Sequence, residues 1–504
     1  DKTSSADMLE GGAAGTVNMR SARPFDHPGA HVAFGAQGTD NQNAGPWGNH
    51  EYVVASDTFS NGLGVLVGGV VSRNNVATPG FETIGWTNPN LSTVRAANGS
   101  SPAATAAQAQ CLASVCNGTG GGNWTIPGTV PAGAGNGLVP GTVINQAFLL
   151  AENPGASIQQ IDNGIIPRLG RDSYEYGYQD NYNSVLSLEY RPNDALHFYM
   201  DNMFSKESND LQREDMDWVG RNGASIPLNE TFDSSNCDNG CTVTGGTFAN
   251  SQFFLEYRPY IEDTNFWGTN PGLNWRATDW LSGDVQANYT KSTFHRESPS
   301  VLVATASDDT VTYTNDGGVP VIGSSINLDD PANFNWAGGR VNVQDERRET
   351  TTKGLRFNVT FGKGGAFNVK TGMAYDDIWR HIDAFDNSQA WQNAICGDDP
   401  SVFVASPNSE PPCQGLDTPT PGAGYPTYPG LGTPVTYAGS LIPQSALANY
   451  LSPGPDGFIT VDWNKLAAAS NYAYYHDNEP ITGSSNTGAS AGYVRNTDTG
   501  MYVE

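Results

Sequence analysis

Residues 355–375 read LRFNVTFGKGGAFNVKTGMAY, and this stretch decides the fold. Leu355, Phe357, Val359 and Phe361 alternate with polar residues, and the alternation resumes at Phe367 after a glycine-rich turn. Successive side chains of a β-strand point to opposite faces, so a period of two predicts strands with one apolar and one polar face. The stretch therefore predicts an antiparallel hairpin.

The same alternation recurs along the chain. It predicts strands at about 31–39, 51–58, 63–72, 181–190, 196–205, 265–275, 280–292, 353–361 and 366–380, with a tenth starting at Thr499. The hairpins turn tightly at one end and open at the other into long insertions, at about 73–178, 206–262, 293–350 and 381–498. Short turns on one side and long loops on the other are typical of a transmembrane β-barrel, whose periplasmic turns are short and whose extracellular loops are long.

The alternative is a secreted β-sandwich, propeller or β-helix, because its strands also alternate. Asp284, Arg356 and Lys370 lie on the face opposite the large apolar residues, and such groups suit a wet lumen better than a dry core. The pattern therefore favours an all-β fold, an antiparallel transmembrane barrel with long extracellular loops.

Composition narrows the function classes. The 504 residues carry a formal net charge of −27, which argues against a nucleic-acid-binding surface. The 59 glycines and 31 prolines are spread along the chain, so long regular helices are not expected. No apolar run approaches the roughly 20 residues of a membrane-spanning helix.

The six cysteines form three local pairs in loop-like stretches. The economical interpretation is three disulfides, Cys111–Cys116, Cys237–Cys241 and Cys396–Cys413, and hence an oxidising compartment. Free thiols in a cytosolic protein are the alternative, and the spacing does not determine the pairing.

The amino end carries a family resemblance. Residues 8–26 read MLEGGAAGTVNMRSARPFD, which resembles the end of the plug domain of TonB-dependent outer-membrane receptors. The matching positions are Glu10, Gly11, Gly12, Gly15, Thr16, Val17, Arg20, Arg23 and Pro24. In this family such arginines look like partners for acidic groups on the inner barrel wall, where they hold the plug in place.

The resemblance implies a domain division and a location. Residues 1–26 are then the carboxy-terminal end of a plug, and residues 27–504 are the amino-proximal part of a barrel in the outer membrane of a Gram-negative bacterium. Because such barrels have about 22 strands, the nine or ten predicted here make an incomplete barrel and a piece of a larger receptor. Outer-membrane lipid surrounds the barrel, and the partners of the intact receptor are TonB with ExbB and ExbD, although this chain carries no TonB box.

The resemblance further implies energy-coupled uptake of a scarce nutrient and no enzymatic activity. Gly488–Gly492 matches the G-x-S-x-G elbow of hydrolases, but no histidine follows it, since the last is His476. The histidines lack a metal-ligand spacing, so neither a metal site nor a cofactor is expected. The many carboxylates permit a glycosidase pair without indicating one.

The expected cargo is an oligosaccharide. Aromatic residues of the last insertion suit stacking on sugar rings, namely Trp391, Tyr425, Tyr428, Trp463 and Tyr474. The equally weighted alternative is that these rings pack a core within the loop. A ferric siderophore or cobalamin is the alternative cargo, and a secreted β-rich adhesin or carbohydrate-binding protein is the alternative class.

Overall fold

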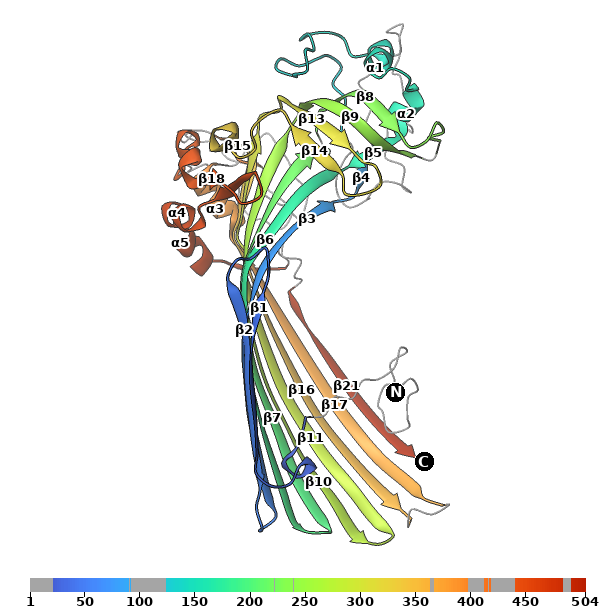
Figure 1. Cartoon of the computed structure of the whole chain (residues 1–504), viewed down its shortest axis with the longest axis vertical. Helices are drawn as coiled ribbons and strands as arrows, with labels where there is room; N and C mark the ends of the chain where they lie inside the picture. The colour runs from blue at the N-terminus through green and yellow to red at the C-terminus, as the bar shows by residue number, and fades with distance from the viewer. Residues whose placement is uncertain are drawn as a thin grey trace.

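The large sheet dominates the molecule (Figure 1). The computed structural model describes residues 21–89, 91, 124–221, 223–238, 240–362, 367–397, 412–415, 417, 440–483 and 491–504. The long strands, in order across the sheet, are β1 (His31–Asp40), β2 (Trp47–Thr58), β3 (Leu63–Thr83), β6 (Leu169–Asn193), β7 (Leu196–Val219), β10 (Phe253–Thr278), β11 (Leu281–Glu297), β16 (Gln344–Phe361), β17 (Val369–Asp386) and β21 (Gly492–Val503).

Every long strand is antiparallel to its neighbour, as the alternation predicts. All ten predicted strands are present, which confirms the all-β class. In the part of the chain that the structure describes, β1 pairs only with β2, so the sheet is open rather than a closed barrel.

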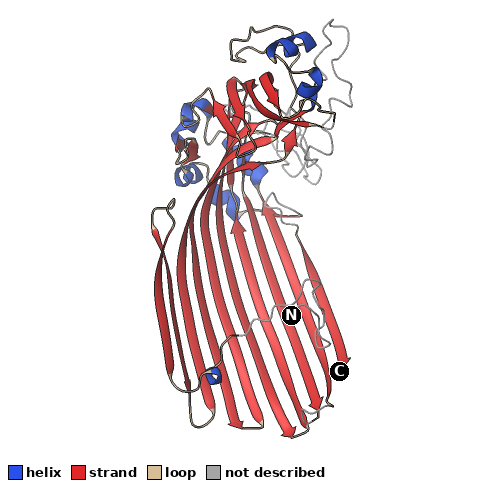
Figure 2. Cartoon of the chain, turned by 45° about the vertical axis from the view of Figure 1, so that its right-hand side comes forward, coloured by secondary structure: helices blue, strands red, loops and turns tan. Residues whose placement is uncertain are grey.

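The strands are much longer than predicted. β3 pairs with β6 from Leu63 to Thr83, and β7 pairs with β10 from Leu196 to Trp218. The predicted loop boundaries at 73, 178, 206, 262, 293, 350, 381 and 498 are therefore wrong, because the hydrogen-bonded ladder continues past them. Figure 2 shows these strands rising from the short turns into the region of the insertions.

The insertions fold at the upper ends of the strands. A second sheet contains β4 (Trp86–Thr87), β5 (Gly164–Pro167), β8 (Ile226–Phe232), β9 (Cys241–Ser251), β13 (Asp309–Thr314) and β14 (Val321–Ser324). Smaller strands are β12 (Ser300–Thr305) and β15 (Phe334–Asn342), which extend the large sheet from β10, β20 (Ile481–Thr482), which pairs with β17, and the pair β18 (Leu451–Pro453) and β19 (Ile459–Val461).

The helices are short. They are η1 (Pro24–Asp26), α1 (Gln146–Glu152), α2 (Ile158–Asn163), η2 (Pro331–Asn333), α3 (Ser388–Ile395), η3 (Gln444–Tyr450), α4 (Trp463–Ala469) and α5 (Tyr472–Asp477). None of these described helices has the length and apolar character needed to cross a membrane.

The hydrophobic core lies among the insertions, not between the long strands. Trp124, Trp218 and Trp336 are fully buried there. Two of the expected disulfides, Cys237–Cys241 and Cys396–Cys413, are present in this region, whereas Cys111 and Cys116 lie outside the described residues. The insertions thus carry a folded unit with its own core.

Candidate functional site

The two faces of the large sheet differ in polarity along its lower half. One face exposes large apolar side chains, including Val53, Val67, Val71, Tyr182, Leu186, Phe198, Phe204, Trp267, Leu355, Phe357, Phe361 and Met373. The opposite face carries Ser187, Asp201, Asn274, Asp284 and Asn358. On that face Asn358 Nδ2 donates to Asp284 Oδ2 at 2.9 Å. We call these the apolar face and the polar face.

The upper limit of the apolar face is staggered. Going up each strand from β3 to β17, the first charged residues on this face are Arg73, Asp180, Lys206, Asp263, Lys291, Lys353 and Asp377. Going from Arg73 to its paired residue on the next strand, and so on across the sheet, leads to Asp383 in β17. Asp383 lies six residues above Asp377 (383 − 377 = 6). Relative to this line the boundary is level on β6 and β10, two residues lower on β7, four lower on β11 and six lower on β16 and β17, so it descends overall as it crosses the sheet.

Aromatic side chains border the apolar face at both limits. Tyr182, Phe204 and Trp267 lie close below the upper limit and are each 44–46% exposed. Near the short turns, Tyr190 stacks on Phe198, and Trp280 stacks on Phe361. Exposed aromatic rings thus form two borders around a band of aliphatic residues.

Arg23 fastens the amino-terminal segment to the polar face. Its guanidinium donates to Asp201 at 2.9 Å from Nε and at 2.6 Å from Nη2, and it lies 3.6 Å from the centre of the Tyr199 ring. The Phe25 amide donates to Glu189 Oε2 at 2.7 Å, and the Arg191 guanidinium covers the Phe25 ring. We call this group of residues the anchor.

The sheet is shaped to receive the anchor. Pro24, one of the motif residues, is buried at the start of η1 and lies over Gly64, where an added Cβ would come within 2.7 Å of the Pro24 side chain. Tyr199 covers Gly272 in the same way, since a Cβ there would lie 2.2 Å from the ring. Glycine at both positions lets η1 and the aromatic ring lie close to the backbone.

Several predicted residues cannot be placed. The motif residues Glu10, Gly11, Gly12, Gly15, Thr16, Val17 and Arg20 and the aromatic residues Tyr425 and Tyr428 lie outside the described residues.

The described loop aromatics do not form one exposed surface. Trp391 is fully buried, and its indole N–H donates to the Ser470 carbonyl at 3.3 Å. Trp463 packs edge-on against Trp391 and Tyr472. The prediction that Trp391 stacks on a sugar is therefore wrong, because its faces pack the loop core, which was the alternative interpretation. Tyr474 is exposed.

A cavity of about 810 Å³ offers a better ligand pocket. It lies between the upper end of β3 and the hairpin of β13 and β14, and its lining includes Phe81, Trp86, Asp233, Asn315 and Asp316. Two aromatic rings beside carboxylates, an amide and threonine hydroxyls suit a neutral polyhydroxylated ligand. No local sequence pattern indicates this pocket, because its residues come from three separate insertions.

A network of charges crosses the polar face above the anchor. Arg171 contacts Glu82, Asp217 and Glu256 at 3.3, 3.0 and 3.2 Å. Arg213 and Arg258 both contact Asp215. Burial raises the pKa of Asp217 to about 7. The network ties β3, β6, β7 and β10 together where the apolar face has ended.

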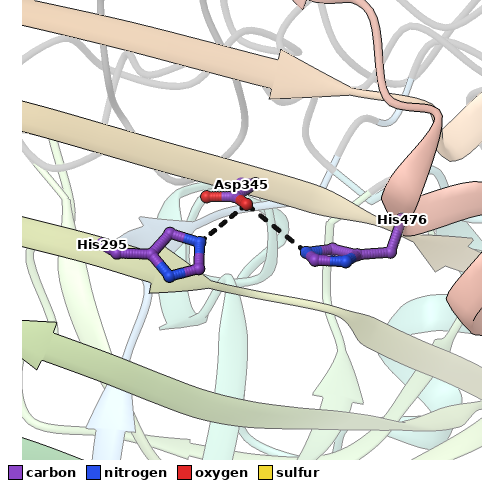
Figure 3. Close-up of side chains that lie close together, drawn as sticks. All are labelled: His295, Asp345 and His476. Carbon is purple, nitrogen blue, oxygen red and sulfur yellow. Dashed lines mark hydrogen bonds and ion pairs between the residues drawn. The ribbon is translucent and has the colours of Figure 1, made fainter.

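A second polar group joins three distant segments. Figure 3 shows the rings of His295 and His476 on either side of the Asp345 carboxylate. The His295 and His476 Nε2 atoms lie 2.8 and 3.4 Å from the same Asp345 oxygen, Oδ2. Burial alone would raise the pKa of Asp345, but hydrogen bonding to the two histidines holds it at about 2. The Asp345 carboxylate raises the pKa of His476 to about 9. These are the described residues best arranged to hold a metal ion.

Comparison with known proteins provides no identity for the chain. No family model matches it, and no curated protein matches it either. What the molecule does must therefore be inferred from its sheet, its anchor and its pocket.

Proposed function

We propose that this chain belongs to an outer-membrane receptor of a Gram-negative bacterium, which takes up a nutrient by energy-coupled transport. The observation that carries the proposal is the staggered apolar band. A band facing lipid must be level with the membrane, so on tilted strands it must cross the hydrogen-bonded register at an angle.

The stagger gives the tilt. Six residues along a strand correspond to about 20 Å, and the six steps from β3 to β17 correspond to about 29 Å across the sheet. The ratio gives a tilt of about 35°, within the range of roughly 35–45° found in membrane barrels. In a soluble sheet, nothing requires the upper limit of an apolar face to cross the strands at this angle.

The open edges set a condition on the proposal. Unpaired backbone groups are strongly unfavourable in lipid, so membrane-spanning strands must form a closed barrel. In the described residues β1 and β21 each pair with a single neighbouring strand. The functional form therefore requires further strands that pair with both edges.

The anchor supports the receptor class. A two-pronged arginine–carboxylate contact on the polar face would hold a plug segment inside the barrel, and its release would open a path. The family resemblance of the Arg23-Pro24 segment implies that TonB, ExbB and ExbD drive that release.

An oligosaccharide is the proposed cargo. Its support is the pocket lined by Phe81 and Trp86, where rings and hydrogen-bonding groups are combined without a surplus of cations that would favour an anionic siderophore. Trp86→Ala should weaken oligosaccharide binding at least tenfold in calorimetric titration, whereas the exposed Tyr474→Ala, the matched aromatic control, should not.

Adjacent residues test the membrane orientation. Phe357 and Asn358 lie side by side on opposite faces, so single cysteines placed there should report different surroundings. A fluorophore at Phe357→Cys should be quenched by brominated lipids in outer-membrane vesicles, and one at Asn358→Cys by water-soluble iodide. Equal quenching by iodide at both positions, or recovery of the chain as a soluble secreted protein, would refute the proposal.

Uptake separates the cargoes. A strain lacking the gene should lose growth on the oligosaccharide that binds the pocket and keep its growth under iron limitation. Loss of iron or cobalamin uptake with unchanged growth on oligosaccharides would overturn the cargo while leaving the receptor class in place.

A further inference from the structure

We propose that His295, Asp345 and His476 form a binding site for a first-row transition-metal ion, Zn²⁺ being preferred, which clamps the last insertion onto the large sheet. This site is independent of the proposed transport function. It lies at the upper ends of β11 and β16, where α5 of the insertion packs against them.

The geometry suits a tetrahedral ion. Ligand atoms about 2.0–2.1 Å from such an ion lie about 3.3 Å from one another. The observed distances from Asp345 Oδ2 are 2.8 Å to His295 Nε2 and 3.4 Å to His476 Nε2, and the three ligand groups all lie within 4.8 Å of one another. Small side-chain rotations would bring all three to an ion between them.

Two of the atoms lack the partners that burial normally demands. Among the described residues, Asp345 Oδ1 is buried and makes no hydrogen bond, and the buried His476 Nε2 has no contact closer than the 3.4 Å to Asp345 Oδ2. Leaving a buried polar atom unsatisfied costs about 1–3 kcal/mol, more if the group is charged. A bound cation would satisfy both residues at once, because it accepts an imidazole lone pair and a carboxylate oxygen together.

The surroundings favour a cation and offer a fourth ligand. Glu297 Oε2 lies 3.9 Å from His476 Nε2, and its other oxygen accepts a hydrogen bond from Tyr472 at 2.7 Å. Asp477 lies 3.5 Å from His476 Nδ1 and Glu479 is nearby, whereas Arg347 contacts Asp345 Oδ2 at 3.5 Å and opposes a cation. Carboxylates therefore outnumber this single arginine.

The donor set selects the metal. Two imidazole nitrogens and one or two carboxylate oxygens suit Zn²⁺, whereas Mg²⁺ and Ca²⁺ prefer oxygen ligands alone. The ligands come from β11, β16 and α5, so an ion would tie the insertion, whose segment 387–480 follows β17, to the strands that support it.

Binding is tested with the full chain in detergent, stripped with chelator and titrated with zinc chloride. We expect one Zn²⁺ per chain, and an affinity at least tenfold weaker in His295→Gln and in His476→Gln. His381→Gln is the matched control, because this exposed histidine contacts Asp383 and the Trp379 ring and lies outside the cluster. No saturable binding, or equal affinity in all three variants, would refute the site.

The clamp is tested by proteolysis. Segment 387–480 contains a single trypsin site, after the exposed Lys465 of α4. Zn²⁺ should slow cleavage there at least severalfold in the unmodified chain and not in His476→Gln, while Mg²⁺ should have no effect on either. Cleavage that is slowed equally in the variant would overturn the clamp. If His476→Gln fails to fold, His295→Gln replaces it, because His295 is more exposed and lies on a strand that the ladder already holds.

Discussion

Loss of Arg23 should release the amino-terminal segment from the sheet. The arginine and Asp201 are only 11% and 14% exposed, and they are joined by three charge-assisted hydrogen bonds. Removing one partner of a fully buried pair costs about 3–5 kcal/mol, and partial solvent access reduces this to about 2–3 kcal/mol. Because about 1.4 kcal/mol is a factor of ten, the opening equilibrium of the segment should rise ~30–160-fold in Arg23→Gln.

Hydrogen exchange at the Phe25 amide measures this opening. That amide donates to Glu189, so it exchanges only when η1 leaves the sheet. Asp201→Asn should accelerate the exchange similarly, and the double variant should add little because the two residues act through one contact. Arg73→Gln is the matched control, since it breaks an arginine–aspartate pair with Asp180 on the other face. Unchanged exchange in Arg23→Gln, or equal acceleration in Arg73→Gln, would refute the anchor.

Three further predictions concern the apolar band, the buried Glu230 and the Cys396–Cys413 disulfide. Phe357→Lys should destabilise the protein in lipid vesicles by about 2–4 kcal/mol, read from urea unfolding, whereas Asn358→Lys on the polar face should have a much smaller effect. Burial raises the pKa of Glu230 to about 8, so the folded state keeps a proton that the unfolded state loses above pH ~4.5. The free energy of unfolding should therefore fall by up to about 1.4 kcal/mol per pH unit between pH ~4.5 and pH ~8. Glu230→Gln should flatten this slope in thermal unfolding curves. Replacing Cys396 and Cys413 with serine should destabilise α3 by about 3 kcal/mol, detected as faster exchange of the Trp391 amide with that of Leu211 in the large sheet unchanged.

The strands were predictable from the sequence where apolar and polar residues alternate, and their continuation was not predictable where the alternation stops. Residues 344–352 of β16 read QDERRETTT and contain no apolar side chain, yet all of them pair with β17 and residues 345–352 also pair with β11. This segment is a strand because the ladder on both sides continues, an influence that no local pattern records. Pro259 likewise argues in the sequence against a strand at that point of β10, although it lies opposite Gln212 within the sheet.

The candidate sites show the same division. The motif around Arg23 indicated a cationic contact, but its partner Asp201 lies 178 residues away and is one of many acids. His295, Asp345 and His476 belong to three elements separated by 50 and 131 residues, so no spacing rule could collect them. The loop aromatics were recognisable, but whether Trp391 was exposed or buried depended on tertiary packing.

In the proposed receptor, β3 would separate the site of capture from the site of passage. The residues from Val71, at the top of the apolar face, to Phe81, in the pocket, span about 33 Å of extended chain, and those from Gly64, beneath η1, to Phe81 span about 56 Å along the strand. If the apolar band lies in the outer membrane, as we propose, the headgroup layer of only several ångströms would leave a ligand in the pocket well above the membrane surface. In the proposed receptor, a molecule bound there would not reach the anchor, so tight binding at the pocket would raise the local supply of cargo but would have to be released before that cargo moved inward.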